Sequence, residues 1–115
     1  MKDYPCPACG FQVFDEPPGS YDICPICGWE DDDVQLRFPG MTGGANKQSL
    51  FEYQRSFLRG VPIDVQERKG YRRDPAWRPL NLKECIASEK APRTGLDYFQ
   101  AAAEGPYDEY YWRKA

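Results

Sequence analysis

Hydrophobic and polar positions alternate most regularly in the stretch that follows Ser49. Apolar side chains recur there at offsets of three, seven and eight residues, the spacing of one face of an α-helix. These side chains are Leu50, Tyr53, Phe57 and Leu58. Ser49 and Glu52 have the spacing of a capping box, and Gly60 is a residue type that ends helices. The pattern predicts a helix that ends at Gly60 and whose apolar face lies in the core or covers the N-terminal region.

Two weaker helical patterns follow in the second half of the chain. Asn81 begins a second capped helix, and the residues expected on its buried face are Leu82, Cys85 and Ile86. The sequence pattern of residues 94–103 predicts a third helix. The tyrosine-rich segment 107–113 reads as a strand or a docking stripe, and we favour a place in the core.

The N-terminal third instead contains one five-residue phrase twice. Residues 6–10 read Cys-Pro-Ala-Cys-Gly and residues 24–28 read Cys-Pro-Ile-Cys-Gly, with fourteen residues between the two cysteine pairs. The proline in each phrase favours a tight turn, and the final glycine permits the positive φ that such a turn needs. Paired C-x-x-C turns at this spacing are typical of a tetrahedral four-thiolate metal site. The predicted ligands are Cys6, Cys9, Cys24 and Cys27.

Disulfides and redox-active pairs are the alternatives for these cysteines. Disulfides need an oxidising compartment, but residues 1–5 contain no apolar signal segment, so we expect a cytoplasmic protein. A thioredoxin-like pair would lie in a βαβ unit, which neither phrase has around it. Metal binding is therefore favoured over both alternatives.

The identity of the metal is less constrained than its ligands. Zinc and iron both accept four thiolates, and the aromatic residues around the two phrases suit a zinc ribbon or a rubredoxin-like iron module. We favour Zn²⁺, with iron as the alternative, because the chain has no other redox motif. A closed four-cysteine site leaves no position for water or substrate, so its expected role is structural.

Length and composition indicate one small domain. A chain of 115 residues with 15% aromatic side chains can bury a modest core, and residues 1–115 are predicted to form a single domain. The expected class is α+β: a zinc-ribbon-like or rubredoxin-like module in residues 1–38, packed on a mainly helical body in residues 46–115 that could end in a strand. No run is long and apolar enough for a membrane helix, so no membrane partner is expected.

The net charge of −3 is unevenly distributed. Residues 1–45 contain eight acidic and two basic side chains, whereas residues 46–95 contain six acidic and eleven basic ones. The densest acidic run directly follows the second phrase and consists of Trp29, Glu30, Asp31, Asp32 and Asp33. Adjacent carboxylates repel one another, so we expect them to be solvated, either as a plain charged turn or as a docking patch for a basic protein. Trp29 is expected to fold back over the metal site.

A basic stretch with interleaved aromatic residues supports an alternative function, a nucleic-acid-binding zinc ribbon. The candidate residues are Arg68, Lys69, Tyr71, Arg72, Arg73 and Arg78. Arginines would contact phosphates while Tyr71 or Trp77 stacked on bases. We favour a solvated connection in which Trp77 packs inward and the arginines pair with the acidic module, because an acidic protein repels a polyanion.

Catalysis is not expected. The chain contains no histidine, which excludes the commonest general base and every histidine-dependent nucleophile or metal site. The adjacent carboxylates of residues 30–33 are unlike the desolvated pair that acid–base chemistry needs. Cys85 belongs to no C-x-x-C pair and is expected to be a small core residue rather than a ligand or nucleophile.

Several separated phrases resemble one family. Between Tyr4 and Phe57 the chain contains, in order, CPAC, EPPGSYDICPICGWEDDDVQL and GGANKQSLFEYQRSF. This half of the chain resembles the bacterial cysteine-rich CPCC family of small proteins. Ala8 stands at the third position of the Cys-Pro-Cys-Cys motif that names the family, which argues that Cys6 and Cys9 are the ligands.

The resemblance implies a metal-binding domain in a bacterial cytoplasm and implies no reaction. Some small cysteine-rich proteins of this kind look like immunity partners of secreted toxins. The expected function is therefore a zinc-stabilised interaction module that binds a basic protein, such as a toxin. A rubredoxin-like iron module for electron transfer is a further alternative, and the oligomeric state stays open.

Overall fold

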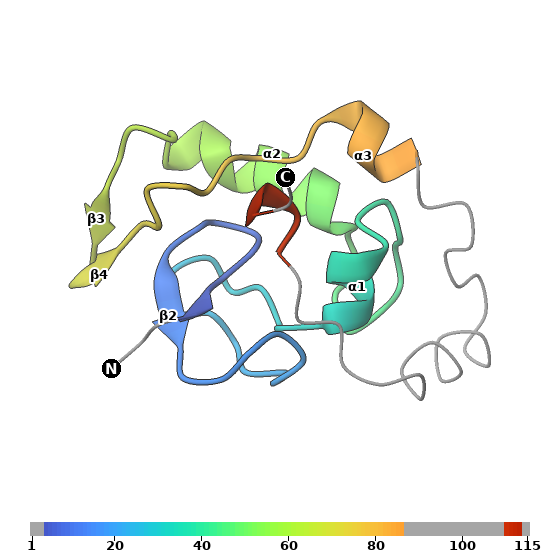
Figure 1. Ribbon diagram of the computed structural model, residues 1–115, viewed down its shortest axis with the longest axis horizontal. Coiled ribbons are helices and arrows are strands. Elements are labelled where there is room, and N and C mark those ends of the chain that lie inside the picture. Colours follow the sequence, from blue (N-terminus) through green and yellow to red (C-terminus); the bar gives the residue numbers. More distant parts are fainter. Residues whose placement is uncertain (1–3, 87–109, 114–115) are drawn as a thin grey trace.

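Short elements joined by long loops make up the described part of the chain. The computed structural model describes residues 4–86 and 110–113. In chain order the elements are β1 (Tyr4–Pro5), β2 (Gln12–Phe14), α1 (Asp33–Arg37), α2 (Leu50–Gly60), β3 (Glu67–Arg68), β4 (Tyr71–Arg72), α3 (Leu82–Ile86) and the 3₁₀ helix η1 (Tyr111–Arg113). Helix α2 crosses one side of the molecule, and the N-terminal loops lie along this helix (Figure 1). The short helix η1 lies near the centre of the molecule.

Strands β1 and β2 form a short antiparallel pair around the first cysteine phrase. Tyr4 pairs with Phe14 and Pro5 with Gln12, with a shift of register between the two pairs. The second phrase is bracketed in the same way by an antiparallel bridge between residues 23 and 30. Each phrase therefore forms the tip of a small ribbon. We call residues 6–10 the first cysteine turn and residues 24–28 the second.

Helix α2 confirms the helix predicted from the apolar pattern. Ser49 Oγ accepts a hydrogen bond from the Glu52 N–H (3.1 Å), and Glu52 Oε1 accepts one from the Ser49 N–H (3.3 Å). On the predicted face Leu50 is fully buried. The other three members, Tyr53, Phe57 and Leu58, are partly buried against the core. A polar residue, Gln54, lies at the centre of the helix and is also buried.

The hydrophobic core lies where α2, the two cysteine turns and η1 meet. Its members are chiefly cysteines and aromatic residues. The buried aromatic residues are Phe11, Phe14, Trp29, Trp77, Tyr110, Tyr111 and Trp112. Each buried ring removes roughly 150–250 Å² from water, so these rings contribute much of the apolar area of the core.

A buried polar network fixes the glycine-rich loop before α2 onto α1. Gln35 Nε2 donates hydrogen bonds to the carbonyl oxygens of Met41, Asn46 and Gln48, each at 3.1 Å. The Asn46 backbone N–H donates to Gln35 Oε1 at 3.0 Å, and its side chain pairs with the backbone of Glu30. Because these bonds satisfy the carboxamides, the loop is held in one path from α1 to the start of α2.

The basic stretch forms a projecting hairpin. Strands β3 and β4 pair antiparallel, with Glu67 opposite Arg72 and Arg68 opposite Tyr71. The two turn residues, 69 and 70, have φ values of 52° and 84°, and two consecutive positive φ values define the type I′ turn that suits a two-residue hairpin. The hairpin lies at one end of the molecule, at the left edge of Figure 1.

The mixed α+β class holds, but a mainly helical body is not confirmed. In its described part, the region after residue 46 contains α2, the hairpin, the five-residue helix α3 and η1. Tyr110, Tyr111 and Trp112 are buried as core residues, and the expected strand is wrong here, because residues 111–113 form a 3₁₀ turn. The helix predicted at 94–103 lies outside the described residues.

The prediction of a buried face on α3 is wrong for Leu82. Its side chain is 61% exposed. Asn81 and Glu84 cap this short helix reciprocally, at 2.9 and 3.0 Å, and Arg78 binds Glu84 from the outside. Among the side chains of this helix that the structure describes, the half-buried Cys85 packs against the core, and the side chain predicted at Ile86 lies outside that description. In residues 4–86 and 110–113, no helix has the length and apolarity needed to cross a lipid bilayer.

Candidate metal centre

The structure brings the four predicted thiols into one cluster. All four Sγ atoms lie within 4.8 Å of one another. Cys6 Sγ is 3.7 Å from Cys27 Sγ, and Cys9 Sγ is 3.7 Å from Cys24 Sγ. These separations are too long for disulfides, whose sulfur atoms are about 2.05 Å apart. They match the edge of a tetrahedron with metal–sulfur bonds of about 2.3 Å, which is about 3.8 Å.

The two cysteine turns have the same backbone geometry. In the first, the Gly10 N–H donates to the Cys6 carbonyl at 2.7 Å, and in the second the Gly28 N–H donates to the Cys24 carbonyl at 2.9 Å. The two glycines have φ values of 83° and 85°, as the sequence predicts. Cys24 Sγ also accepts bonds from the N–H groups two and three residues onward, both at 3.4 Å. The repeated phrase thus encodes a repeated turn that aims two sulfurs at one point.

Residues far along the chain hold the first cysteine turn through its carbonyl oxygens. The Pro7 carbonyl accepts hydrogen bonds from Gln54 Nε2 at 2.7 Å and from the Trp77 indole at 3.1 Å. The Trp77 ring also covers Gly10 so closely that a Cβ there would lie 2.5 Å from it. The turn is therefore fitted to the body and is not an independent loop.

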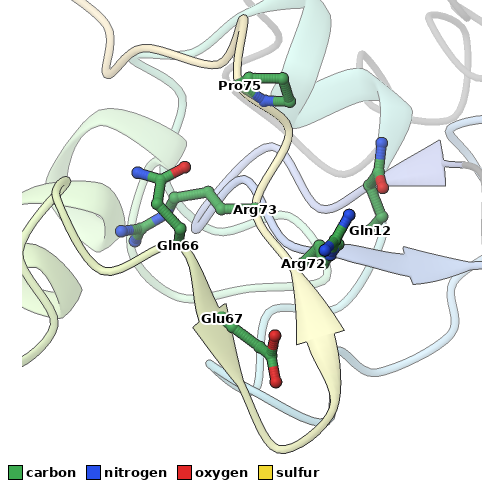
Figure 2. A pocket seen from close by; sticks show the side chains of 6 residues that line it. All are labelled: Gln12, Gln66, Glu67, Arg72, Arg73 and Pro75. Atoms are coloured by element: carbon green, nitrogen blue, oxygen red, sulfur yellow. The ribbon is translucent and has the colours of Figure 1, made fainter.

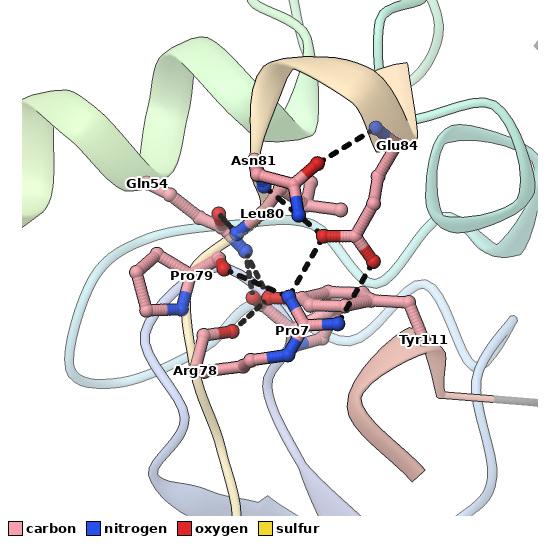
Figure 3. A network of polar contacts seen from close by, with 8 residues as sticks. All are labelled: Pro7, Gln54, Arg78, Pro79, Leu80, Asn81, Glu84 and Tyr111. Atoms are coloured by element: carbon pink, nitrogen blue, oxygen red, sulfur yellow. Dashed lines mark hydrogen bonds and ion pairs between the residues drawn. The ribbon is translucent and has the colours of Figure 1, made fainter. Parts of the chain in front are cut away.

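Figure 3 shows the polar contacts that Gln54 makes with three separate segments of the chain. Besides bonding Pro7, its amide donates to the Tyr111 hydroxyl at 2.8 Å, and its Oε1 accepts from the Leu80 N–H at 2.8 Å. The Tyr111 hydroxyl in turn donates to the Arg78 carbonyl. One buried carboxamide therefore connects the first cysteine turn, α2, the segment before α3 and η1.

Arg73 is a second long-range clamp on the same turn. Its Nε donates to the Cys9 carbonyl at 2.7 Å, and its other nitrogens donate to carbonyls of the segment that follows α2, including Pro62 at 2.6 Å. The guanidinium lies 4.6 Å from the centre of the Phe11 ring. Burial lowers the pKa of Arg73 below its usual value, but a guanidinium remains charged in proteins. It places a positive charge beside the cysteine cluster.

The second cysteine turn is held by α2. The Tyr53 hydroxyl donates to the Cys27 carbonyl at 2.5 Å, and the Tyr53 ring contacts Trp29 edge to face, with centroids 5.1 Å apart. Burial, followed by the charge of the nearby cysteines, raises the pKa of Tyr53 to about 12, so the hydroxyl stays a donor. Trp29 is fully buried in the core with the cysteines. Helix α2 thus contacts both turns.

The close packing of four cysteine sulfurs favours a bound cation between them. Cys6, Cys9 and Cys24 are buried, and Cys27 is half-buried. Burial raises the pKa of Cys6 and Cys9 well above the usual thiol range, whereas hydrogen bonds from the neighbouring thiols, Cys27 foremost, lower the pKa of Cys24. Four thiolates this close repel one another, and one guanidinium offsets only part of their charge. Four soft sulfur donors in a small, nearly closed space fit a tetrahedral transition-metal ion.

The acidic run does not lie where the sequence predicts. The expectation of solvated carboxylates is wrong for Asp31, Asp32 and Asp33, which are at most 6% exposed, while Glu30 is half-buried. Asp32 is the N-cap of α1: its Oδ1 accepts the Val34 N–H at 2.8 Å. These carboxylates therefore cannot act as an exposed docking patch in this conformation.

Asp31 anchors the loop that connects the two cysteine turns. Its Oδ2 accepts bonds from the Ser20 hydroxyl at 2.6 Å and from the Ser20 N–H at 3.3 Å. Its backbone carbonyl accepts the Tyr21 N–H at 3.0 Å, and Tyr21 adopts a positive φ of 60°. Burial raises the pKa of Asp31 to about 6. A carboxylate predicted to face solvent instead positions the exposed loop of residues 15–23.

The candidate nucleic-acid residues separate into two groups. Arg68, Lys69 and Arg72 are exposed on the hairpin, and Tyr71 is half-buried. Arg73 is buried, and Figure 2 shows its side chain turned to the opposite side of the chain from Arg72. Arg72 lies beside Gln12 at the edge of a polar hollow of about 370 Å³.

The other arginine, Arg78, pairs with Glu84 of α3 at 2.7 Å. The predicted pairing with the acidic module is therefore wrong for Arg73 and Arg78, which bind backbone carbonyls and α3. The prediction that Trp77 packs inward is confirmed, since the ring is 4% exposed.

Cys85 lies outside the cluster formed by the other four cysteines. It packs partly buried against the core, and its Cβ and carbonyl lie near Gly40. Burial raises the pKa of Cys85 to about 11, so its thiol stays protonated near neutral pH. The expected role as a small packing residue agrees with this position.

Sequence reasoning missed Gln54, Tyr53 and Arg73 as supports of the site. A signal existed for Gln54, because a carboxamide four residues after Leu50 lies beside the apolar face of α2. Such a residue is buried only with hydrogen-bond partners. Nothing in the spacing of Arg73 pointed to the carbonyl of Cys9.

Comparison with known proteins identifies a family but no individual relative among the curated proteins. The family model described as Cysteine-rich CPCC matches residues 4–75. The matched segment contains both cysteine turns, α1, α2 and the hairpin, and it ends after Arg73. A search of the curated proteins found no match.

Proposed function

We propose that this chain, which belongs to the cysteine-rich CPCC family, is a zinc-stabilised module that binds a basic protein and catalyses no reaction. The observation that carries the proposal is the closed cluster of four thiols, three of them buried. A metal held by four thiolates has no position left for water or substrate. The ion would therefore stabilise a surface and would not act on a ligand.

Zinc is favoured over iron on chemical grounds. Both ions fit four thiolates, and the distances between the sulfurs suit either. Electron transfer would need a redox partner, and the sequence carries no second redox motif. Zinc bound in this way contributes folding free energy directly, on the order of 10 kcal/mol when binding and folding are coupled. A small, loop-rich chain benefits from that contribution.

The surface proposed for the partner is the loop of residues 15–23, which we call the inter-turn loop. It exposes three carboxylates together with two apolar side chains, Tyr21 at 40% and Ile23 at 64% exposure. The exposed acidic residues are Asp15, Glu16 and Asp22. Aromatic residues rimmed by charge are typical of protein-binding surfaces. The anchoring of Asp31 to Ser20 holds this loop in place.

Charge defines the class of partner. Carboxylates on a rigid loop attract a basic surface and select against acidic competitors. An immunity-type role, in which the partner is a basic toxin, fits this chemistry. A cytoplasmic location is part of the proposal, because free thiolates persist in a reducing compartment.

Metal analysis of the protein purified from its native host tests the first half of the proposal. We expect one zinc per chain, a colourless protein, and loss of tertiary structure when a strong chelator removes the metal. A coloured protein with one iron per chain would instead support the electron-transfer alternative.

Quantitative cross-linking in the same host tests the proposed surface. A Glu16→Gln/Asp22→Asn variant should lose its cross-linked partner, and binding of the parent should weaken with salt. Glu67→Gln, an exposed acid on the distant hairpin, is the control and should bind normally. Equal partner recovery for all three proteins would contradict the surface assignment.

The nucleic-acid alternative rests on one observation, the exposed basic side chains of Arg68, Lys69 and Arg72 on a projecting hairpin. It predicts binding to single-stranded DNA or RNA at low salt, lost when these three residues become glutamine. Absence of binding to mixed-sequence probes at low salt would remove this alternative.

A further inference from the structure

We propose that Cys27 is a modification site: it is the cysteine at which hydroperoxides first oxidise the metal-bound cluster, and Cys6 completes the reaction. The inference rests on the proposed metal occupancy of the site. It is argued from the unequal burial of the four thiols, from a surface hollow beside one of them, and from the pairing of the sulfur atoms.

The four cysteines differ in their access to solvent. Cys6 and Cys9 are fully buried and Cys24 is 2% exposed, whereas Cys27 is half-buried. A metal-bound thiolate remains a nucleophile, and its reactivity depends on whether a reagent can reach it. In the described structure, Cys27 is therefore the entry point to the cluster.

A hollow in the surface lies directly at this residue. Its volume is about 280 Å³, several times that of a hydroperoxide. It is lined by Cys27, Gln48, Tyr53, Ser56 and Phe57. The rings of Tyr53 and Phe57, one turn apart on α2, provide an apolar wall, while Gln48 and Ser56 are exposed lining residues. A small neutral oxidant such as a hydroperoxide suits this lining better than a large or charged reagent.

The reaction proceeds in two balanced steps. In the first, the Cys27 thiolate attacks the hydroperoxide: an S–O bond forms, the O–O bond breaks, and the departing oxygen takes a proton and leaves as water or an alcohol. In the second, the Cys6 thiolate attacks the oxidised sulfur: an S–S bond forms, the S–O bond breaks, and hydroxide leaves. Two thiolates have then given two electrons to one peroxide.

The choice of Cys6 as the resolving thiol follows from distance. Its sulfur lies 3.7 Å from that of Cys27, and contraction to about 2.05 Å forms the disulfide. Cys9 and Cys24 form the other close pair, at 3.7 Å. Loss of two ligands leaves the metal with only this second pair, so metal release accompanies the first disulfide.

The test uses the whole 115-residue chain with Cys85→Ser, which removes its one thiol outside the cluster. The metal content of the starting sample is measured first. The sample is then treated with hydrogen peroxide, metal release is followed with a chromophoric chelator, and acid-quenched aliquots are mapped by peptide mass spectrometry. We expect the first oxidised residue to be Cys27, the first disulfide to be Cys6–Cys27, and metal release at the same rate.

A filled hollow provides the matched comparison. Ser56→Phe adds a ring at an exposed lining position of α2 and should slow oxidation about fivefold or more, because access limits the rate. Arg59→Phe adds the same ring at an exposed position of α2 outside the hollow and should react at the parental rate.

The outcomes separate the two proposals. A sample that contains iron or no metal overturns the proposed zinc module. A zinc-loaded sample overturns only the present inference if its first oxidised residue is Cys6, Cys9 or Cys24, if Cys27 pairs with another cysteine, or if both phenylalanine variants react alike.

Discussion

Replacing Gln54 with leucine should loosen the metal site, although Gln54 supplies no ligand to it. Gln54 is 1% exposed, and its carboxamide makes three hydrogen bonds, to Pro7, Tyr111 and Leu80. The Pro7 carbonyl keeps its bond from Trp77 in the variant, but the buried Leu80 N–H loses its acceptor. Such a loss costs about 1–3 kcal/mol, and each further lost bond about 0.5–1.5 kcal/mol. We therefore expect the free energy of unfolding to fall by about 3 kcal/mol.

Denaturant unfolding at a fixed, buffered free zinc concentration measures this loss. The midpoint should shift while the slope stays constant, because the same surface is exposed on unfolding. Metal binding is coupled to folding, so the apparent zinc affinity should fall in parallel; about 3 kcal/mol corresponds to a factor of about 100. Competition with a chromophoric chelator measures that affinity independently.

Two further variants make the reasoning refutable. Arg55→Leu changes an exposed neighbour on the same helix and should cost no more than about 0.5 kcal/mol. Gln54→Glu keeps the acceptor for Leu80 but turns a donor into an acceptor facing the Pro7 carbonyl, so it should destabilise at least as much near neutral pH. If Gln54→Leu costs less than about 0.5 kcal/mol, the carboxamide does not connect the first turn to the body.

Three other perturbations have expected outcomes. Cys24→Ser should release the metal and unfold the N-terminal module, whereas Cys85→Ser should cost only about 1–2 kcal/mol in packing, as judged by metal analysis and thermal unfolding. Gly10→Ala places a Cβ 2.5 Å from a buried indole and should cost at least twice as much as Gly43→Ala, which also has a positive φ but an open surrounding; denaturant midpoints decide. Asp31 has a folded pKa of about 6, above that of the unfolded chain, so its contribution to stability is present below about pH 4 and is lost as pH rises to 6. The free energy of unfolding of Asp31→Asn, measured at several pH values, should therefore rise relative to that of the parent between about pH 4 and pH 6.

Local chemistry explains what the sequence could predict. The capping box of Ser49 and Glu52 and the glycines that end the two cysteine turns act within a few residues, and each appears in the structure as expected. Each turn aims two sulfurs at one point, and the spacing between the two turns is typical of a shared metal site. The helix and the sulfur cluster were predictable because their determinants lie next to one another in the chain.

The misplaced elements depend on partners that no local pattern reveals. Adjacent carboxylates usually face water, but Asp31 accepts a hydrogen bond from Ser20 and Asp32 caps α1. Both carboxylates are therefore buried. Asp32 is a residue type favoured at N-caps, and it stands two residues before the apolar Val34. Arg73 was taken for a surface cation, whereas its partners are carbonyl oxygens, which every residue carries and which therefore leave no mark in a sequence.

The clamps on the first cysteine turn set an order of events during synthesis. The bonds to Pro7 from Gln54 and Trp77 span 47 and 70 residues, and the bond from Arg73 to Cys9 spans 64. A growing chain leaves the ribosome from its N-terminus, so all four cysteines emerge well before their clamps do. The nascent chain can thus capture a metal ion early, in a loose and exchangeable form. The site would close around such an ion only when the later residues have emerged, so metal selection would precede metal retention.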